Sequence, residues 1–341
     1  MNIAPYSELN REAWDDYVFN HPEGTIYHTT QWMRSVQETF NQEQYYHLCI
    51  DGTIIKGVMP LFCIKTLFSG IKAVSIPWAM YGGILADSKE EQTALLNFAE
   101  KEIEDRGIDF LELRNLYHNG LSLPEQDMYV TYIKKLEQNE EKILQNIPRK
   151  SRASVRNGYN KFNLKSRFSQ DVNILYHLYL LNKRKLGSPP YPRKFFEILI
   201  NEFGDNAGIL YIEYENRTIA GVLFFTYKDT IYPYFSGSNG NFNFTNSNNL
   251  MYFELMKYAL KIGLRNFDFG RSRINTGSGK FKQNMGFEPT PLHYYFFSPK
   301  QDQIPNINPS NRKFDLISKI WTKLPLPLTE FLGPKIVKRI P

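Results

Sequence analysis

Alternating hydrophobic and polar positions predict two β-hairpins that lie far apart in the chain. Residues 45–61 alternate around an Asp-Gly turn at 51–52, where glycine suits the positive φ of a tight hairpin. Residues 209–225 alternate in the same way. The glycines of two similar segments, Gly57 and Gly221, are 164 positions apart. One such match is weak, so the segments that follow decide whether the chain contains a repeat.

An amphipathic helix is predicted after each hairpin. The first begins after Ser88, an N-cap residue with Glu91 three positions later as a capping box, and Gly107 ends it. The second covers about 249–262, carries most of its apolar residues on one side, and stops at Gly263.

The neighbouring segments keep the same order in both parts. An aromatic, glycine-containing segment, expected to be a strand, precedes each helix, at 78–83 and at 232–237, and an apolar strand follows, at 108–113 and at 264–269. The two helix-ending glycines are 156 positions apart. Because the order recurs at a nearly constant offset, we predict a duplicated α/β unit.

The connecting and C-terminal segments complete the predicted organisation. Helices are expected near 148–156, 171–185 and 192–203. The tail is rich in Pro and Asn, and its apolar stripe (Phe314, Ile317, Ile320, Trp321 and Leu324) is expected to form a helix that ends at Pro325 and Pro327. The predicted domains are 1–146, 147–298 with a basic helical entry segment, and a tail at 299–341.

Composition indicates a folded chain of two domains. It has 341 residues, of which 42% are hydrophobic and 15% aromatic, which excludes extensive disorder. Cys49 and Cys63 are too few for a disulfide framework, and the histidines show no metal-ligand spacing, so we expect no metal site. Without a signal peptide or membrane-spanning stretch, the expected location is cytoplasmic.

Positive charge is concentrated between the two repeated parts. Lys and Arg number 41 against 35 Asp and Glu, and the run 149–167 holds seven cations and no acid. Arg152 and Arg156 share one helical face there, and Arg184 belongs to a second basic cluster. Such residues suit the phosphates of tRNA or of an anionic envelope precursor, and equally a solvated helix surface.

Three C-terminal motifs carry a resemblance to a known family. Residues 249–255 with Gly263, residues 267–272, and residues 279–289 resemble the C-terminal signature of FemAB-like proteins, including those linked to exopolysaccharide and exosortase systems. The resemblance covers roughly residues 10–295. It implies an α/β (α+β) fold of two tandem GNAT-like domains, each a mixed, mostly antiparallel sheet flanked by helices. It also implies amide-bond formation between an activated acyl or aminoacyl donor and an amine of a peptidoglycan or polysaccharide precursor.

Charged side chains in these motifs are the candidate catalytic residues. The family pattern implies that Lys282 contacts a phosphate or developing negative charge, whereas residue type alone fits a solvated lysine. Arg271 follows a strand end, where it could bind a ligand or pair with Asp268. Asp268 and Glu254 are candidate bases, with a salt bridge and a helix-face acid as their structural alternatives.

Candidate substrate-binding residues are aromatic or lie in the same motifs. Trp78 and Tyr81 stand beside a glycine pair in the first part, and Tyr234 is their counterpart in the second; each could instead be core. Asn249 and Lys280 join this group through the motifs that resemble the family.

The donor is expected to be aminoacyl-tRNA or acyl-CoA, with no permanently bound cofactor. Residues 236–248, where a GNAT protein would bind the CoA diphosphate, contain no Arg, Lys or Gln, which disfavours CoA. Two alternatives remain: a CoA-dependent N-acyltransferase of an amino sugar, and a non-catalytic polyanion-binding module. The basic tail is a candidate for peripheral contact with the inner membrane face. The sequence leaves donor, acceptor, reactive half, general base and oligomeric state undetermined.

Overall fold

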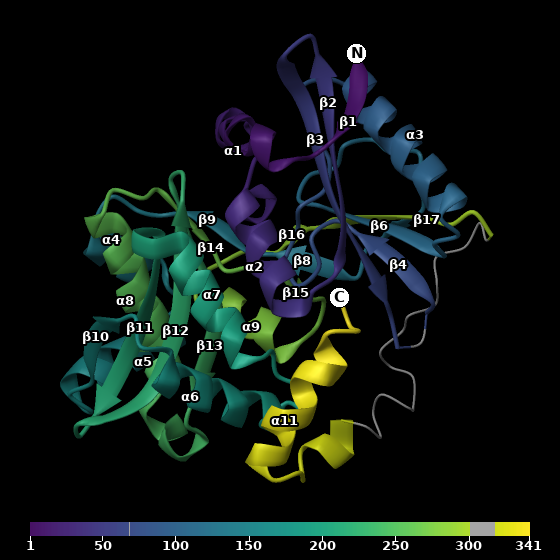
Figure 1. Cartoon of the computed structure of the whole chain (residues 1–341). Helices are drawn as coiled ribbons and strands as arrows, with labels where there is room; N and C mark the ends of the chain where they lie inside the picture. The colour runs from purple at the N-terminus through teal and green to yellow at the C-terminus, as the bar shows by residue number, and fades with distance from the viewer. Residues whose placement is uncertain (68, 301–317) are drawn as a thin grey trace. The chain divides into compact units, whose positions relative to one another are not determined.

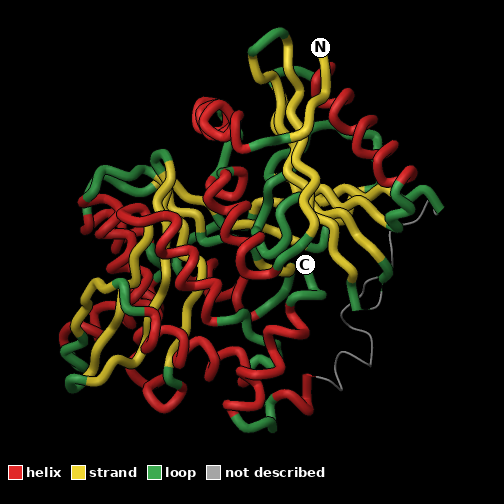
Figure 2. Tube along the Cα trace, viewed as in Figure 1, coloured by secondary structure: helices red, strands yellow, loops and turns green. Residues whose placement is uncertain are grey.

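The chain forms two compact units in the computed structural model, which describes residues 1–67, 69–300 and 318–341. Of these, unit 1 contains residues 1–129, 291–300 and 335–341, and unit 2 contains residues 130–290 and 318–334. Each unit combines a mainly antiparallel sheet with helices (Figure 1, Figure 2). The predicted mixed α/β class is confirmed.

Unit 1 is built on an eight-stranded sheet. Its strands are β1 (Asn2–Pro5), β2 (Glu43–Asp51), β3 (Ile54–Lys65), β4 (Ile71–Val74), β5 (Leu85–Ala86), β6 (Phe110–Asn115), β7 (Glu125–Gln126) and β17 (His293–Phe297). Its helices are α1 (Arg11–Asn20), α2 (Thr30–Phe40) and α3 (Lys89–Asp105), with short 3-10 turns η1 (Glu8–Asn10) and η2 (Ile26–His28). The strand order is β1-β2-β3-β4-β6-β17-β7, with β5 paired to β3. Helix α3 runs beside β2 and β3 (Figure 1) and packs Leu95 and Ala99 into a core with Leu111.

Unit 2 repeats this plan around a six-stranded sheet. Its strands are β8 (Tyr129–Thr131), β9 (Ile133–Lys135), β10 (Lys165–Ser169), β11 (Ala207–Tyr214), β12 (Arg217–Tyr227), β13 (Thr230–Ser238), β14 (Asn266–Asp268), β15 (Ser272–Arg273) and β16 (Thr290–Pro291). Its helices are α4 (Glu140–Asn146), α5 (Arg149–Asn160), α6 (Val172–Lys185), α7 (Arg193–Phe203), α8 (Ser247–Lys261) and α9 (Gly277–Asn284), with 3-10 turns η3 (Gly204–Asn206) and η4 (Gly240–Thr245). The strand order is β10-β11-β12-β13-β14-β9, and β15, β8 and β16 form a small separate sheet.

Helices cover both faces of the six-stranded sheet. Leu210 and Val222 point to one face, where they share a buried cluster with Leu250 of α8. Helix α6 lies on the other face, close to β13: a Cβ added to Gly237 would lie 2.4 Å from the backbone carbon of Leu178. Only glycine permits this approach, which fixes α6 against the strand.

Local sequence signals place the element ends as predicted. Both hairpins form, and the helices expected at 148–156, 171–185 and 192–203 are α5, α6 and α7. Ser88 caps α3 by accepting a hydrogen bond from Glu90 N at 3.1 Å, one residue earlier than in the expected capping box. Gly107 and Gly263 follow α3 and α8 with φ of +63° and +82°.

In each half, the strand that follows the main helix pairs with a strand that comes from outside that half's repeated segment. In unit 1, β17 comes from the far end of the chain and pairs antiparallel with β6. In unit 2, β9 precedes the second repeat and pairs antiparallel with β14. Among the described residues the compact units divide the chain at 129/130, at 290/291 and again in the tail at 334/335, whereas we expected 146/147 and 298/299. The short strands β9 and β17 carry no sequence signal for the sheet that they join.

One local prediction is wrong. Residues 78–83, expected as a strand, are irregular, with φ of +57° at Trp78, whereas their counterpart 232–237 lies within β13. In the tail, the described residues 318–321 are helical and this helix ends before Pro325, as expected. Pro325 and Pro327 also stand at the start of a second helix, α11 (Leu326–Val337), because proline fits the first turn, where no backbone donor is needed. Phe314 and Ile317 of the expected stripe lie outside the described residues.

The cysteines are free thiols. In the β2–β3 ladder Cys49 lies opposite Gly57 and Cys63 opposite Glu43, so the hairpin does not pair them. Burial raises the pKa of both thiols, that of Cys63 to about 11, which keeps them protonated and unreactive. No described helix has the length and apolar character needed to cross a membrane.

Candidate active site in the second unit

The candidate site lies where the parallel strands β13 and β14 stop pairing. Ile231 opposite Phe267 is the last paired position of these strands. Beyond it, Tyr252 of α8 contacts both chain segments: its hydroxyl donates to Ser236 Oγ at 3.1 Å, and its ring centroid lies 4.5 Å from that of Phe269. The carboxyl ends of parallel strands are where α/β sheets bind ligands.

Asp268 is a buried carboxyl group at the end of β14. Its residue is 2% exposed, and Oδ1 accepts hydrogen bonds from Gly270 N at 2.9 Å and from Thr131 Oγ1 at 3.2 Å. Burial raises the pKa of Asp268 to about 7, although the Gly270 hydrogen bond and the charge of Lys282 oppose the shift. A carboxyl group with this pKa can accept and release a proton at neutral pH.

Lys282 on α9 is a buried amine rather than a solvated lysine. It is 8% exposed, and Nζ donates to the carbonyl oxygens of Gly270 at 2.7 Å and Arg271 at 3.1 Å. Nζ also lies 5.2 Å from the centroid of the Tyr132 ring. Burial lowers the pKa of Lys282 to about 7. The Arg271 charge also lowers this pKa, whereas the Asp268 carboxylate raises it.

Gly270 connects these two groups. Its N–H binds Asp268 and its carbonyl binds Lys282, so one peptide segment orients both side chains. The residue has φ of +73°, a conformation that glycine adopts without strain. Asp268 and Lys282 are 14 positions apart in sequence, and the turn at Gly270 brings them to one site.

Sequence reasoning missed several residues around this centre. Thr131 and Tyr132 belong to a segment that the sequence assigns to the first domain, and nothing in their surroundings along the chain points to Asp268 or Lys282. Tyr252 lies inside a motif that resembles the FemAB-like family, so that signal was available. Ser236 belongs to residues 236–248, the segment without basic residues. Nothing in the sequence of that segment indicates that Ser236 contacts Tyr252.

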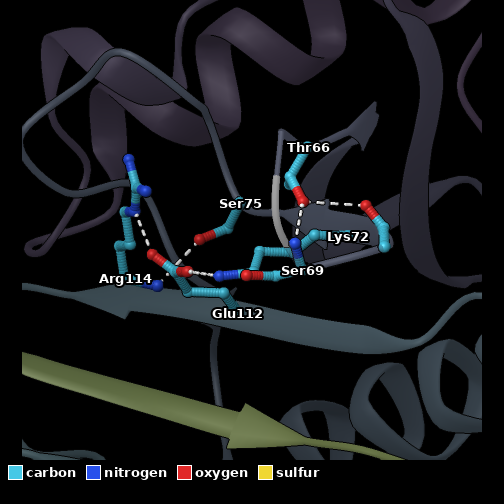
Figure 3. A network of polar contacts seen from close by, with 7 residues as sticks. Thr66, Ser69, Lys72, Ser75, Glu112 and Arg114 are labelled. Carbon is cyan, nitrogen blue, oxygen red and sulfur yellow. Dashed lines mark hydrogen bonds and ion pairs between the residues drawn. The ribbon is translucent and has the colours of Figure 1, made fainter. Parts of the chain in front are cut away.

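The equivalent carboxylate of unit 1 has the opposite character. Glu112 is the fifth residue after Gly107, as Asp268 is the fifth after Gly263. Figure 3 shows Glu112 between two cations: Oε2 lies 2.8 Å from Lys72 Nζ, and Oε1 lies 2.7 Å from Arg114 Nε. Burial alone would raise the pKa of Glu112, but the Arg114 and Lys72 charges hold it at about 2. This carboxylate stays ionised at neutral pH.

Comparison with known proteins places this geometry in a family. Residues 142–283 match the family model described as Acetyltransferase (GNAT) domain. The chain also has the fold of a tandem GNAT protein from the clavulanic acid biosynthesis pathway, with a TM-score of 0.55 and 9% identity over 89% of this chain and 99% of that one. Residues 142–283 therefore match a GNAT acetyltransferase domain, and the chain as a whole has the tandem GNAT fold.

Further solved structures share the fold of this chain. A crystal structure of FemX matches with a TM-score of 0.65 and 14% identity, over 87% of this chain and 98% of that one. The C-terminal domain of a putative lysylphosphatidylglycerol synthetase from Agrobacterium fabrum matches at 0.55 and 9%, over 86% and 93%. The fold is therefore FemAB-like, as expected. No curated protein matches this sequence.

Glu254 lies in a polar cluster on the outer part of α8. Its carboxylate accepts from Ser166 Oγ at 3.0 Å, from Lys257 Nζ at 3.1 Å and from the Tyr159 hydroxyl. These contacts connect α5, β10 and α8. They match the helix-face acid that the sequence left open as the alternative role of Glu254.

Trp78 and Tyr81 are core residues of unit 1. Trp78 Nε1 donates to the carbonyls of Val337 at 3.1 Å and Ile340 at 2.9 Å, and its ring stacks on Phe40 at 3.8 Å. Tyr81 is 1% exposed and meets the Tyr27 ring edge-on at 5.1 Å. These contacts fit the alternative in which Trp78 and Tyr81 are core residues rather than substrate-binding residues.

The remaining candidate residues all lie in unit 2. Tyr234 on β13 and Asn249 on α8 are half-buried, and the Asn249 amide contacts Met285 Sδ at 3.3 Å. Lys280 is exposed on α9, two residues before Lys282. Of the four candidate arginines, Arg156 on α5 is exposed. The other three are half-buried: Arg152 on α5, Arg184 on α6 and Arg271 after β14.

Proposed function

We propose that the protein joins an activated acyl or aminoacyl group to an amine of an anionic cell-envelope precursor, a peptidoglycan or polysaccharide unit, at Asp268 and Lys282 in unit 2. One observation carries this proposal: a buried carboxyl and a buried amine, both with pKa near 7, share Gly270 as a hydrogen-bonding partner. Both residues lie in or directly beside elements of the matched acyltransferase domain.

The reaction requires one proton acceptor and one positive group. The acceptor nitrogen attacks the carbonyl carbon of the donor, a C–N bond forms, and the bond from that carbon to the donor oxygen or sulfur breaks. In our proposal the Asp268 carboxylate takes the proton that the nitrogen loses. The Lys282 ammonium stabilises the oxyanion and then protonates the leaving oxygen or sulfur. Arg271 adds positive charge beside Lys282.

An aminoacyl ester of tRNA is the donor that we favour. Helix α5 presents Arg152 and Arg156 for phosphate contacts, and residues 236–248 offer no cation for the CoA diphosphate. The second candidate is N-acylation of an amino sugar from acyl-CoA, and the description of the matched family as an acetyltransferase favours it. A non-catalytic polyanion-binding module is the third hypothesis.

The test supplies each donor in turn to the purified protein with amine acceptors. Radiolabelled aminoacyl-tRNA and acetyl-CoA are incubated with a peptidoglycan precursor and with an amino sugar, and the acceptor is analysed for added mass and label. We expect label on the precursor from aminoacyl-tRNA, and a loss of about 100-fold or more in Asp268→Asn and Lys282→Gln. Lys261→Gln, an exposed lysine at the end of α8, is the matched control. Transfer that survives both site substitutions would sink the proposal, whereas label from acetyl-CoA alone would select the second candidate.

A further inference from the structure

Helix α11 has two faces of different character. Thr329, Gly333 and Val337 recur every four residues and are buried. Gly333 lies so close to Pro190 that an added Cβ would be 2.3 Å from Pro190 Cδ, so this face is tightly packed. Leu328 and Phe331 lie away from it, three residues apart, and are 40% and 62% exposed.

Cations precede and follow this exposed apolar surface in the sequence. Among residues 318–341, Glu330 is the only acid in the sequence. All the basic side chains of this segment are exposed, and in the sequence they stand on both sides of Leu328 and Phe331: Lys319, Lys323, Lys335, Lys338 and Arg339. Ile320, 54% exposed, is a further exposed apolar side chain, between the first two lysines in the sequence. Large apolar side chains that remain in water next to cations are typical of helices that lie in a membrane interface.

We propose that residues 318–341 dock on an anionic lipid bilayer, with Leu328 and Phe331 entering the boundary between headgroups and acyl chains. The cations then lie at the level of the lipid phosphates, where each adds attraction. Charge favours this occupant over a second copy of the chain: a symmetric dimer through this surface would bring two sets of five cations together. A bilayer rich in anionic headgroups supplies the opposite charge.

Vesicle flotation of the full chain tests this proposal without any acyl donor. Vesicles of phosphatidylcholine alone are compared with vesicles that also contain phosphatidylglycerol, at low and high salt. We expect binding to the anionic vesicles, weakened by salt, and a loss of about tenfold or more in the double variant Leu328→Ser with Phe331→Ser. Lys335→Glu should lower binding to anionic vesicles by about tenfold.

Matched controls separate this surface from general stickiness. Phe244→Ser removes an aromatic ring that is 56% exposed elsewhere in unit 2, and Lys101→Glu reverses an exposed lysine on α3. Both should bind like the unchanged protein. Three results would overturn the proposal: no binding to anionic vesicles, an equal loss in the controls, or a dimer that depends on Leu328 and Phe331. Since the assay involves no acyl transfer, its failure leaves the proposed reaction untouched.

Discussion

Glu112 and Asp268 occupy equivalent positions in the two halves, each five residues after the glycine that ends a helix, yet their pKa values shift in opposite directions. Glu112 has two cations within 2.8 Å and stays ionised. Asp268 accepts hydrogen bonds from Gly270 and Thr131, and burial makes it titrate near neutrality. This difference is why we place proton transfer in unit 2.

The acyl-transfer rate should depend on pH as a bell centred near pH 7. Below this pH Asp268 becomes protonated and cannot accept a proton, and above it Lys282 loses the proton that makes it a cation. Lys282→Arg should flatten the alkaline limb, because guanidinium stays charged with a pKa above about 12. Initial rates measured from about pH 5.5 to about 9 check this, and an alkaline limb that persists in the Arg variant would assign it to another group.

Glu112→Gln should destabilise unit 1 by about 3–5 kcal/mol, because Lys72 and Arg114 would become buried cations without a counter-charge. The folded-state pKa of Glu112 is lowered, so its stabilisation is present above the ordinary pKa near 4.5 and is lost as pH falls toward 2. Urea unfolding at pH 7 and at about pH 3 measures both effects. A cost that did not shrink in acid would contradict the role of this charge.

Gly270→Ala should lower kcat far more than it lowers stability. The backbone there has φ of +73°, which costs alanine about 1 kcal/mol, and any shift displaces the partners of both Asp268 and Lys282. Gly263→Ala is the control: its φ is +82° and open space surrounds it. Thermal unfolding should show similar losses in both variants. Equal kcat values in the two would show that Gly270 does not position the site.

Arg152→Ala combined with Arg156→Ala should weaken tRNA binding about equally for charged and uncharged tRNA. For every phosphate that the double variant no longer neutralises, the slope of log affinity against log salt should become shallower by about 0.7–0.9. Filter binding at several salt concentrations gives that slope. An unchanged slope would leave α5 as a solvated surface, the alternative that its sequence also allows.

Local signals in the sequence determined the regular elements of both halves. Hairpins follow from alternation around turn residues, α3 begins at Ser88, and Gly107 and Gly263 end the two main helices, because each signal acts over a few neighbouring residues. The nearly constant offset between these signals is enough to indicate the duplication. The basic run and the family motifs likewise needed no tertiary information.

Tertiary structure alone decided which residues share an environment. The sequence could not place β9 and β17 in their sheets, since three to five residues carry too little pattern to select a partner strand. It could not show that Lys282 is buried against Gly270, or that Lys72 and Arg114 hold the pKa of Glu112 low while burial raises the pKa of Asp268. Burial and neighbouring charge set a pKa, and both depend on segments that meet only when the chain folds.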